Sequence, residues 1–297
     1  MLSNPAIRIP ILSGKGGVGK TTLALGVALA LKQLDYHPAL LDLDLENPSM
    51  GTACGLSRKD LIFIGELITP PKWEGIPIMS LSLLPLAAFV DTPTLVNEQR
   101  KREIIEHLFI EIEWGDSDIL IIDMPPGSGT EVRGLLGLEP TTSILITSPQ
   151  KLSEAAIRRV IAMTQEYSIP IMGLVENNIN RSGGDAGQRI CTEYKFPLLG
   201  RIGWARDISD AMENNQPFYH KTFTTIAEHI TNTLLPKIDE GVPVSEHTDG
   251  LRSPSVVPDG GGASQQEVAS PEDQGEVSGV STSNSRDGDS PPVTGDN

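Results

Sequence analysis

Short runs of Ile, Leu and Val recur along the first 238 residues and alternate with candidate helices. The runs are apolar at consecutive positions, as expected for strands covered on both faces. This alternation predicts an α/β fold in which helices cover both faces of a mainly parallel sheet, with ligands at the carboxyl ends of the strands. The predicted strands are Ile7–Leu12, Ala39–Asp44, Ile76–Leu84, Ile119–Asp123, Ser143–Thr147, Ile171–Val175 and Leu198–Ile202. The predicted helices are Thr21–Leu34, Asn97–Glu111, Glu131–Leu138, Ser153–Tyr167, Asp185–Tyr194, Ile208–Asn214 and Phe223–Leu235.

The first predicted strand is followed by GKGGVGKT, which fits the phosphate-binding template G-x-x-x-x-G-K-[ST]. Glycines let successive backbone N–H groups surround a phosphate, and the next helix adds the partial positive charge of its N-terminus. We predict that Lys20 contacts the β- and γ-phosphates of ATP and that the Thr21 hydroxyl ligates Mg²⁺. The predicted ATP-binding residues of this segment are Gly14, Lys15, Gly16, Gly17, Val18, Gly19, Lys20, Thr21 and Thr22.

Carboxylates stand at the ends of two predicted strands. Asp42 and Asp44 are two residues apart, so a strand would place both side chains on one face. Such a pair can order Mg²⁺-bound water and position an attacking water, although a polar strand end with an aspartate starting a turn would look the same. Asp123 follows four aliphatic residues in the Walker B pattern. We expect Asp42 and Asp123 to hold Mg²⁺, mainly through water.

Two further strand ends carry candidate nucleotide contacts. The segment after Asp123 reads MPPGSGTE; its prolines stiffen the chain, and Gly127 leaves a backbone N–H able to meet a γ-phosphate. Such a loop can respond to the presence of the third phosphate and so act as a switch. Asn177 follows the strand Ile171–Val175, where its amide could meet the adenine edge or could belong to an ordinary turn.

Composition narrows the classes of partner. The net charge of −16 disfavours binding to nucleic acid and to anionic lipid. The densest basic run is only Arg100–Arg102, which is too short to form a basic patch that would offset this charge. No stretch approaches the ~18 apolar residues of a membrane span, and the N-terminus lacks the apolar core of a signal peptide. Two distant cysteines make no disulfide framework. We therefore expect a cytoplasmic protein that contacts neither nucleic acid nor a membrane.

The composition changes sharply after Ile238. Residues 239–297 contain no aromatic residue and carry twelve acidic residues against two arginines, which accounts for most of the net charge of the chain. Such a segment cannot bury enough apolar surface to offset its ordering entropy. We predict one folded domain, residues 1–238, and an acidic disordered tail, residues 239–297.

Together these motifs resemble the Mrp-type iron–sulfur carrier ATPases of the MinD/ParA-like P-loop superfamily. The resemblance implies a P-loop NTPase domain that forms an ATP-dependent homodimer with two nucleotides at the interface. It further implies that Lys15 reaches the phosphates bound by the other subunit and that Asp44 is the hydrolytic aspartate. Asn177 corresponds to the asparagine of the family's EN(M/N) motif. The matching segments are SGKGGVGKTT, LLDLDLENPS, EWGDSDILIIDMPPGSGTE, ITSPQKLSEAAIRRVIAM, GLVENN and FPLLGRIGWARDISDAMENNQPF.

The chain departs from this family at the cluster site. Mrp-type carriers hold a bridging iron–sulfur cluster on a C-x-x-C pair after the VEN element, but VENNINRSGGDAGQRICTEYKFPLLG contains no such pair. Cys191 is interpreted as a packed helix residue and Cys54 has no partner nearby in sequence. No iron–sulfur ligands are therefore predicted. A second departure is Gly203, where the family commonly has proline. The three tryptophans, Trp73, Trp114 and Trp204, are interpreted as packing anchors in preference to base-stacking platforms.

These observations leave more than one function open. The main hypothesis is a slow Mg²⁺-dependent ATPase whose dimerisation is governed by ATP and which acts in iron–sulfur cluster or metalloprotein assembly. The alternative is a MinD-like regulatory switch that binds a partner protein without carrying a cluster, with turnover of little importance. A phosphotransferase or amidoligase on the same fold would need a further substrate pocket, and no residues in the sequence are committed to one.

Overall fold

The structure is a computed structural model that describes residues 5–239 except 45–46, 66, 85–110, 130–131, 134–135, 137–139 and 179–183. The predicted helix Asn97–Glu111 except its last residue, most of the predicted helix Glu131–Leu138 and the predicted tail beyond Asp239 lie outside the described residues. No helix among the described residues is both long enough and apolar enough to cross a membrane.

The described residues form one eight-stranded sheet in the order β10-β9-β8-β1-β7-β2-β6-β5 and a separate two-stranded ribbon, β3-β4. All neighbours in the large sheet are parallel except the edge pair β5 and β6. The strands of the large sheet are β1 Ile7–Ser13, β2 Pro38–Asp42, β5 Lys72–Trp73, β6 Ile76–Ser80, β7 Ile119–Asp123, β8 Ser143–Thr147, β9 Ile171–Asn178 and β10 Leu198–Gly203. The ribbon consists of β3 Ile62–Ile64 and β4 Leu67–Thr69.

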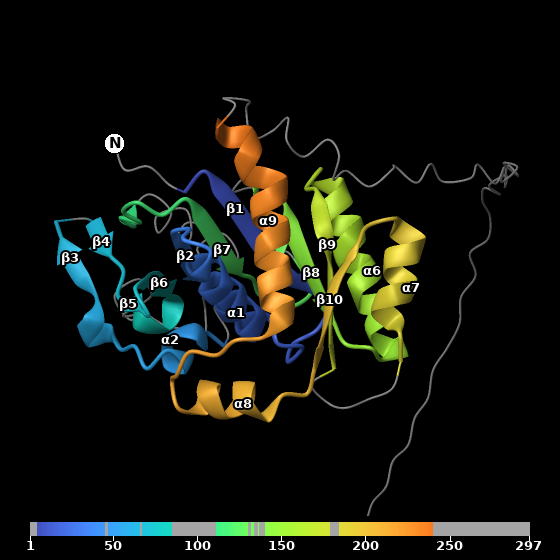
Figure 1. Ribbon diagram of the computed structural model, residues 1–297, viewed down its shortest axis with the longest axis horizontal. Helices are drawn as coiled ribbons and strands as arrows, with labels where there is room; N and C mark the ends of the chain where they lie inside the picture. The colour runs from blue at the N-terminus through green and yellow to red at the C-terminus, as the bar shows by residue number, and fades with distance from the viewer. Residues whose placement is uncertain are drawn as a thin grey trace, which may run out of the picture. The chain divides into compact units, whose positions relative to one another are not determined.

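Helices cover both faces of the sheet (Figure 1). Strand residues alternate between two apolar clusters: Ile119 and Ile121 of β7 pack with one, Leu120 and Ile122 with the other. The first cluster includes α1 and α9, which lie side by side, and the second includes α6 and α7. The described helices are α1 Lys20–Gln33, α2 Met50–Ala53, α6 Lys151–Glu166, α7 Ala186–Tyr194, α8 Arg206–Glu213 and α9 Lys221–Asp239, with short 3₁₀ turns at Arg58–Asp60 and Leu81–Leu83.

Two strand predictions were too long. The predicted strand Ala39–Asp44 ends at Asp42, because the Asp44 N–H turns back to donate to Asp42 Oδ1. The predicted strand Ile76–Leu84 ends at Ser80, whose hydroxyl accepts a hydrogen bond from the Ser82 N–H and so begins a 3₁₀ turn. The predictions Ile119–Asp123 and Ser143–Thr147 are confirmed at both ends.

Candidate functional site

The loop between β1 and α1 leaves helix N-terminal amides for a ligand. Gly17 and Gly19 have φ angles of 71° and 92°, which only glycine adopts without strain. Gly19 is the N-cap of α1, with no side-chain cap and no acidic residue in the first turn. The first N–H groups of α1 therefore have no side-chain acceptor among the described residues, as an anion site at a helix N-terminus requires.

Close packing holds this loop in place from two sides. A Cβ at Gly14 would lie 2.4 Å from the Ala156 carbonyl carbon of α6, so the loop needs glycine here. On the other side, Asn177 Nδ2 at the end of β9 donates to the Val18 carbonyl over 2.9 Å. Asn177 is 4% exposed, so this hydrogen bond is protected from water. The amide predicted to meet adenine thus has one of its donors on the phosphate loop itself.

Buried polar side chains converge beside the loop. Thr21 Oγ1 donates to Asp123 Oδ2 over 2.6 Å, and Asp42 lies directly opposite Asp123 in the β2–β7 pairing. Asp42 and Asp123 are 0% and 2% exposed, and Lys20 is buried next to them. Asp123 Oδ1 is buried with no hydrogen-bond partner among the described residues. The Thr21 hydroxyl and the two carboxylates, one of which has an unpartnered oxygen, are oxygen ligands of the kind that Mg²⁺ prefers.

The electrostatics of this aspartate pair, Asp42 and Asp123, favour a cation. Burial and, after it, the Asp42 carboxylate raise the pKa of Asp123 to about 7, against the Lys20 charge and the Thr21 hydrogen bond, which lower it. Burial also raises the pKa of Asp42, against hydrogen bonds from Ser80, Met50 and Asp44. Both carboxyl groups resist ionisation because they are buried. A bound metal ion would lower their pKa values and so favour the ionised form.

The sequence predicted that Asp44 shares a strand face with Asp42, and this prediction is wrong. Asp44 lies two residues beyond the end of β2, partly exposed, and its Oδ1 accepts a hydrogen bond from the Asn47 N–H. Its backbone N–H caps Asp42 Oδ1 at 3.2 Å, which is the turn that ends the strand. Ser80, which donates to Asp42 Oδ2 over 2.8 Å, was not predicted, although a serine closing the apolar strand β6 is a visible signal in the sequence.

The segment after β7 is joined to the phosphate loop at two points. Thr21 holds Asp123 at its start, and the Gly127 N–H donates to the Ser13 carbonyl over 2.8 Å. Gly127 has a φ of 97°, and a Cβ there would meet nothing within 4 Å, so its backbone faces open space. Lys15, Gly16 and Gly17 are partly or fully exposed on the facing loop. The Gly127 N–H that was predicted to be left for a γ-phosphate is therefore bound to the Ser13 carbonyl in this structure.

Cys54 lies near Asp42 of this site, whereas Cys191 lies near Glu176 of β9. Both are buried, at 5% exposure each. Burial raises the pKa of Cys54 and of Cys191 to about 12, with nearby Asp42 and Glu176 adding to the effect respectively. No group of three or more metal-ligating side chains occurs among the residues that the structure describes. The interpretation of Cys191 as a packed helix residue is confirmed.

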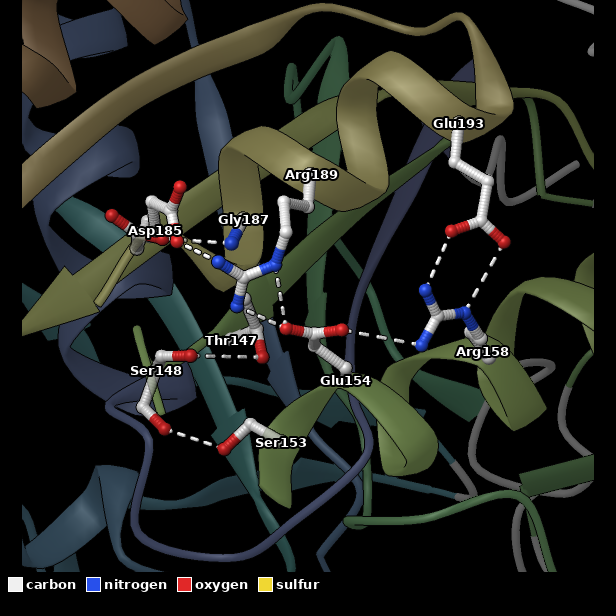
Figure 2. Close-up of polar contacts among 10 residues, drawn as sticks. Thr147, Ser148, Ser153, Glu154, Arg158, Asp185, Gly187, Arg189 and Glu193 are labelled. Carbon is white, nitrogen blue, oxygen red and sulfur yellow. Dashed lines mark hydrogen bonds and ion pairs between the residues drawn. The ribbon is translucent and has the colours of Figure 1, made fainter. Parts of the chain in front are cut away.

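A second cluster of charges ties α7 to α6, and we call it the arginine network. Glu154 of α6 lies between Arg158 and Arg189, and Arg158 also pairs with Glu193 (Figure 2). Arg189 further contacts Asp185 at the start of α7. The arginine hydrogen bonds lower the pKa of both Glu154 and Glu193.

Beside the arginine network, the buried Glu176 of β9 accepts the Gly187 N–H over 2.7 Å and pairs with Arg201 of β10 over 2.9 Å. The Gly187 N–H belongs to the first turn of α7. This end of α7 is therefore closed by the chain's own carboxylate, in contrast to the start of α1.

A glycine loop between a central parallel strand and an uncapped helix, with a lysine and a threonine facing strand-end aspartates, defines a P-loop NTPase. A family model described as ParA: NUBPL iron-transfer P-loop NTPase matches residues 6–239. The chain therefore belongs to this family, and it is an ATPase.

Known proteins agree with this assignment. The chain is 34% identical to an iron-sulfur cluster carrier protein of Aquifex aeolicus, over 78% of this chain and 69% of that protein. It is 35% identical to a cytosolic Fe-S cluster assembly factor NUBP2 homolog of Dictyostelium discoideum, over 66% and 80% of the two chains. A nucleotide-binding protein of Archaeoglobus fulgidus in complex with ADP superposes with a TM-score of 0.60 at 25% identity, covering 71% of this chain and 87% of that one. The septum site-determining protein MinD of Pyrococcus horikoshii, complexed with Mg-ADP, shares the fold at a TM-score of 0.61 and 20% identity, covering 80% and 99%.

Proposed function

We propose that this ATPase works as an ATP-dependent homodimer in the cytoplasm and acts in the assembly of iron–sulfur or other metal-containing proteins. The family assignment and the names of the relatives support the pathway. The observation that carries the proposal is the double connection of the segment Asp123–Gly127 to the phosphate loop, through Thr21 and Ser13. A segment held at both points moves when the contents of the loop change, so a partner can sense whether ATP or ADP is bound.

The residues of the site divide the chemistry between them. Lys20 and the backbone N–H groups of Gly14–Thr22 stabilise the charge that develops on the β- and γ-phosphates. Thr21, Asp42 and Asp123 hold Mg²⁺, which when bound neutralises charge on the phosphate oxygens. Asp44, partly exposed at the edge of the site, orients the attacking water. Lys15 of each subunit reaches the phosphates bound by the other and takes the part of an arginine finger.

An iron–sulfur cluster would be the cargo of this ATPase, and its attachment is where the chain differs from a carrier with a C-x-x-C pair. The two cysteines of the chain, Cys54 and Cys191, are far apart in sequence and both are buried, so they form no such pair. This observation favours the second candidate function, in which the ATP state controls binding to a partner protein that itself holds the metal. In both cases the chain contacts neither nucleic acid nor a membrane.

The dimer is tested by light scattering of the full chain with Mg·ADP and with a slowly hydrolysed ATP analogue. We expect dimers only with the analogue, and only monomers for Lys15→Ala, which should still bind nucleotide. Lys72→Ala is the matched control, because β5 is the edge strand farthest from β1 on its side of the sheet. Dimers of Lys15→Ala that match wild type would show that the cross-subunit role is wrong.

The two candidate functions are separated by anaerobic reconstitution followed by iron and sulfide analysis. The partner-binding function predicts no stoichiometric iron in the wild type or in Cys191→Ser. Stoichiometric iron that Cys191→Ser removes would instead establish a cluster held by the chain, with a subunit rearrangement that exposes this thiol. ATP hydrolysis by both proteins serves as the control for folding.

A further inference from the structure

A cavity of about 170 Å³ lies next to the phosphate loop. Its wall includes Thr22 of α1, Asn177 of β9, Gly203 and Trp204 after β10, and Ile208 of α8. Most of its lining is apolar, with Asn177 and Thr22 as polar side chains at the loop side. An apolar cavity with a few polar groups beside a phosphate site is the expected form of a base-binding pocket.

Trp204 differs from the other two tryptophans. Trp73 and Trp114 are 7% and 2% exposed, as expected of packing anchors, whereas Trp204 is 44% exposed and lines the cavity. The expectation that all three are packing anchors is therefore wrong for Trp204. An aromatic ring that is half open to solvent at a pocket wall presents a surface on which a flat ligand can stack.

The backbone around Trp204 leaves room for such a ligand. A Cβ at Gly203 would meet nothing within 4 Å, so glycine here keeps the pocket wall thin beside the indole. Asn177 ties the pocket to the phosphate loop through the Val18 carbonyl, and Thr22 lies one residue after the predicted magnesium ligand. Base and phosphates of one nucleotide can therefore occupy the cavity and the loop together.

We propose that Trp204 stacks on the nucleobase of the bound nucleotide and is a main determinant of nucleotide affinity in this chain. The inference rests on the proposed ATP site and adds the residue that holds the base. Stacking on an aromatic ring is tolerant of base identity, because every base has a π face. Discrimination between bases then falls to the Asn177 amide, while Trp204 sets the strength of binding.

The test uses the full chain, calorimetry and tryptophan fluorescence. Mg·ADP should change the fluorescence of the wild type, because Trp204 is the exposed tryptophan, and inorganic tripolyphosphate, which lacks a base, should not. Trp204→Ala should weaken Mg·ADP binding about tenfold while leaving tripolyphosphate affinity unchanged. Trp204→Phe should retain most of the ADP affinity, since it keeps an aromatic face. Tyr167→Ala is the control, an exposed aromatic at the C-terminal end of α6.

The outcomes distinguish this inference from the site on which it rests. Loss of ADP affinity in Trp204→Ala with unchanged tripolyphosphate binding supports stacking. Equal ADP affinities in wild type, Trp204→Ala and Trp204→Phe would overturn it while leaving the ATP site intact. Failure of the wild type to bind ADP in calorimetry would instead refute the ATP site itself. An equal loss for ADP and tripolyphosphate in Trp204→Ala would show damage to the loop and also overturn the stacking role.

Discussion

The molecule contains two groups of carboxylates in opposite electrostatic states. In the aspartate pair, Asp42 and Asp123, burial raises the pKa of both side chains, and Asp123 reaches about 7. In the arginine network, hydrogen bonds from Arg189 and Arg158 lower the pKa of Glu154 and Glu193 respectively. In the first group burial outweighs the opposing charge of Lys20, and in the second the arginine hydrogen bonds outweigh burial.

This difference separates a ligand site from a structural joint. Buried carboxylates whose pKa stays raised gain most when a further cation binds, and such perturbed groups cluster at functional sites. The helices beside them follow the same rule. The N-terminus of α1 has no side-chain cap, whereas the first turn of α7 donates to the buried Glu176. The same kind of helix start thus binds a ligand in one place and closes the fold in the other.

The largest expected effect is the loss of Lys20. Lys20→Ala removes the buried cation of the ligand site, so Mg·ATP affinity measured by calorimetry should fall at least about 100-fold. The matched change in the arginine network, Arg189→Ala, should leave ATP affinity within about twofold, because among the described residues Arg189 forms its ion pairs with Glu154 and Asp185. Similar losses of affinity in the two variants would contradict the division into ligand site and joint.

The next effect is a pH dependence carried by Asp123. A folded pKa of about 7 against an ordinary 3.8 means that protonated Asp123 stabilises the fold fully below about pH 4, and this stabilisation is lost as the pH rises through about 7. Asp123→Asn stays neutral, so without nucleotide its melting temperature should exceed that of wild type at pH 8 and approach it at pH 5. The difference has an upper limit of roughly 4 kcal/mol.

Two controls accompany this dependence of melting temperature on pH: the glutamates of the arginine network and the addition of Mg·ADP. Glu154 and Glu193 have lowered pKa values, so their stabilisation is present above about pH 4.5 and is lost as the pH falls below it. Wild type and Asp123→Asn both contain these glutamates, so both should lose the same amount of stability as the pH falls below about 4.5. Adding Mg·ADP at pH 8 should reverse the order, because the wild type alone keeps the carboxylate for Mg²⁺. A difference in melting temperature between wild type and Asp123→Asn that stays constant from pH 5 to 8 would refute the raised pKa of Asp123.

The sequence predicted the ligand site better than the joint, for physical reasons. Lys20, Thr21 and Asp123 belong to short motifs in which local chain geometry fixes the contacts, and strand-end positions in a parallel sheet converge. Asp44 was placed on the strand because alternation cannot show that a backbone N–H will turn back to Asp42. The arginine network joins α6 to α7 across 35 positions of sequence, from Arg158 to Glu193, and no local pattern reveals such pairs. Trp204 was misread because composition says nothing of exposure.

The smallest effect belongs to the outer part of the arginine network. Arg158 and Glu193 have side chains that are 37% and 46% exposed, so solvent screens their attraction. Arg158→Ala should therefore lower the free energy of unfolding by only about 0.5–1 kcal/mol, seen as a shift of ~2–4 °C in melting temperature. The loss should shrink in 1 M NaCl, where the Debye length is ~3 Å. Arg206→Ala is the matched control, because Arg206 and Asp210 are 79% and 64% exposed at 3.5 Å and should contribute almost nothing. A salt-insensitive loss of ~3 kcal/mol or more for Arg158→Ala would mean that its charge is effectively buried, and the contrast between a desolvated ligand site and a solvated joint would then fail.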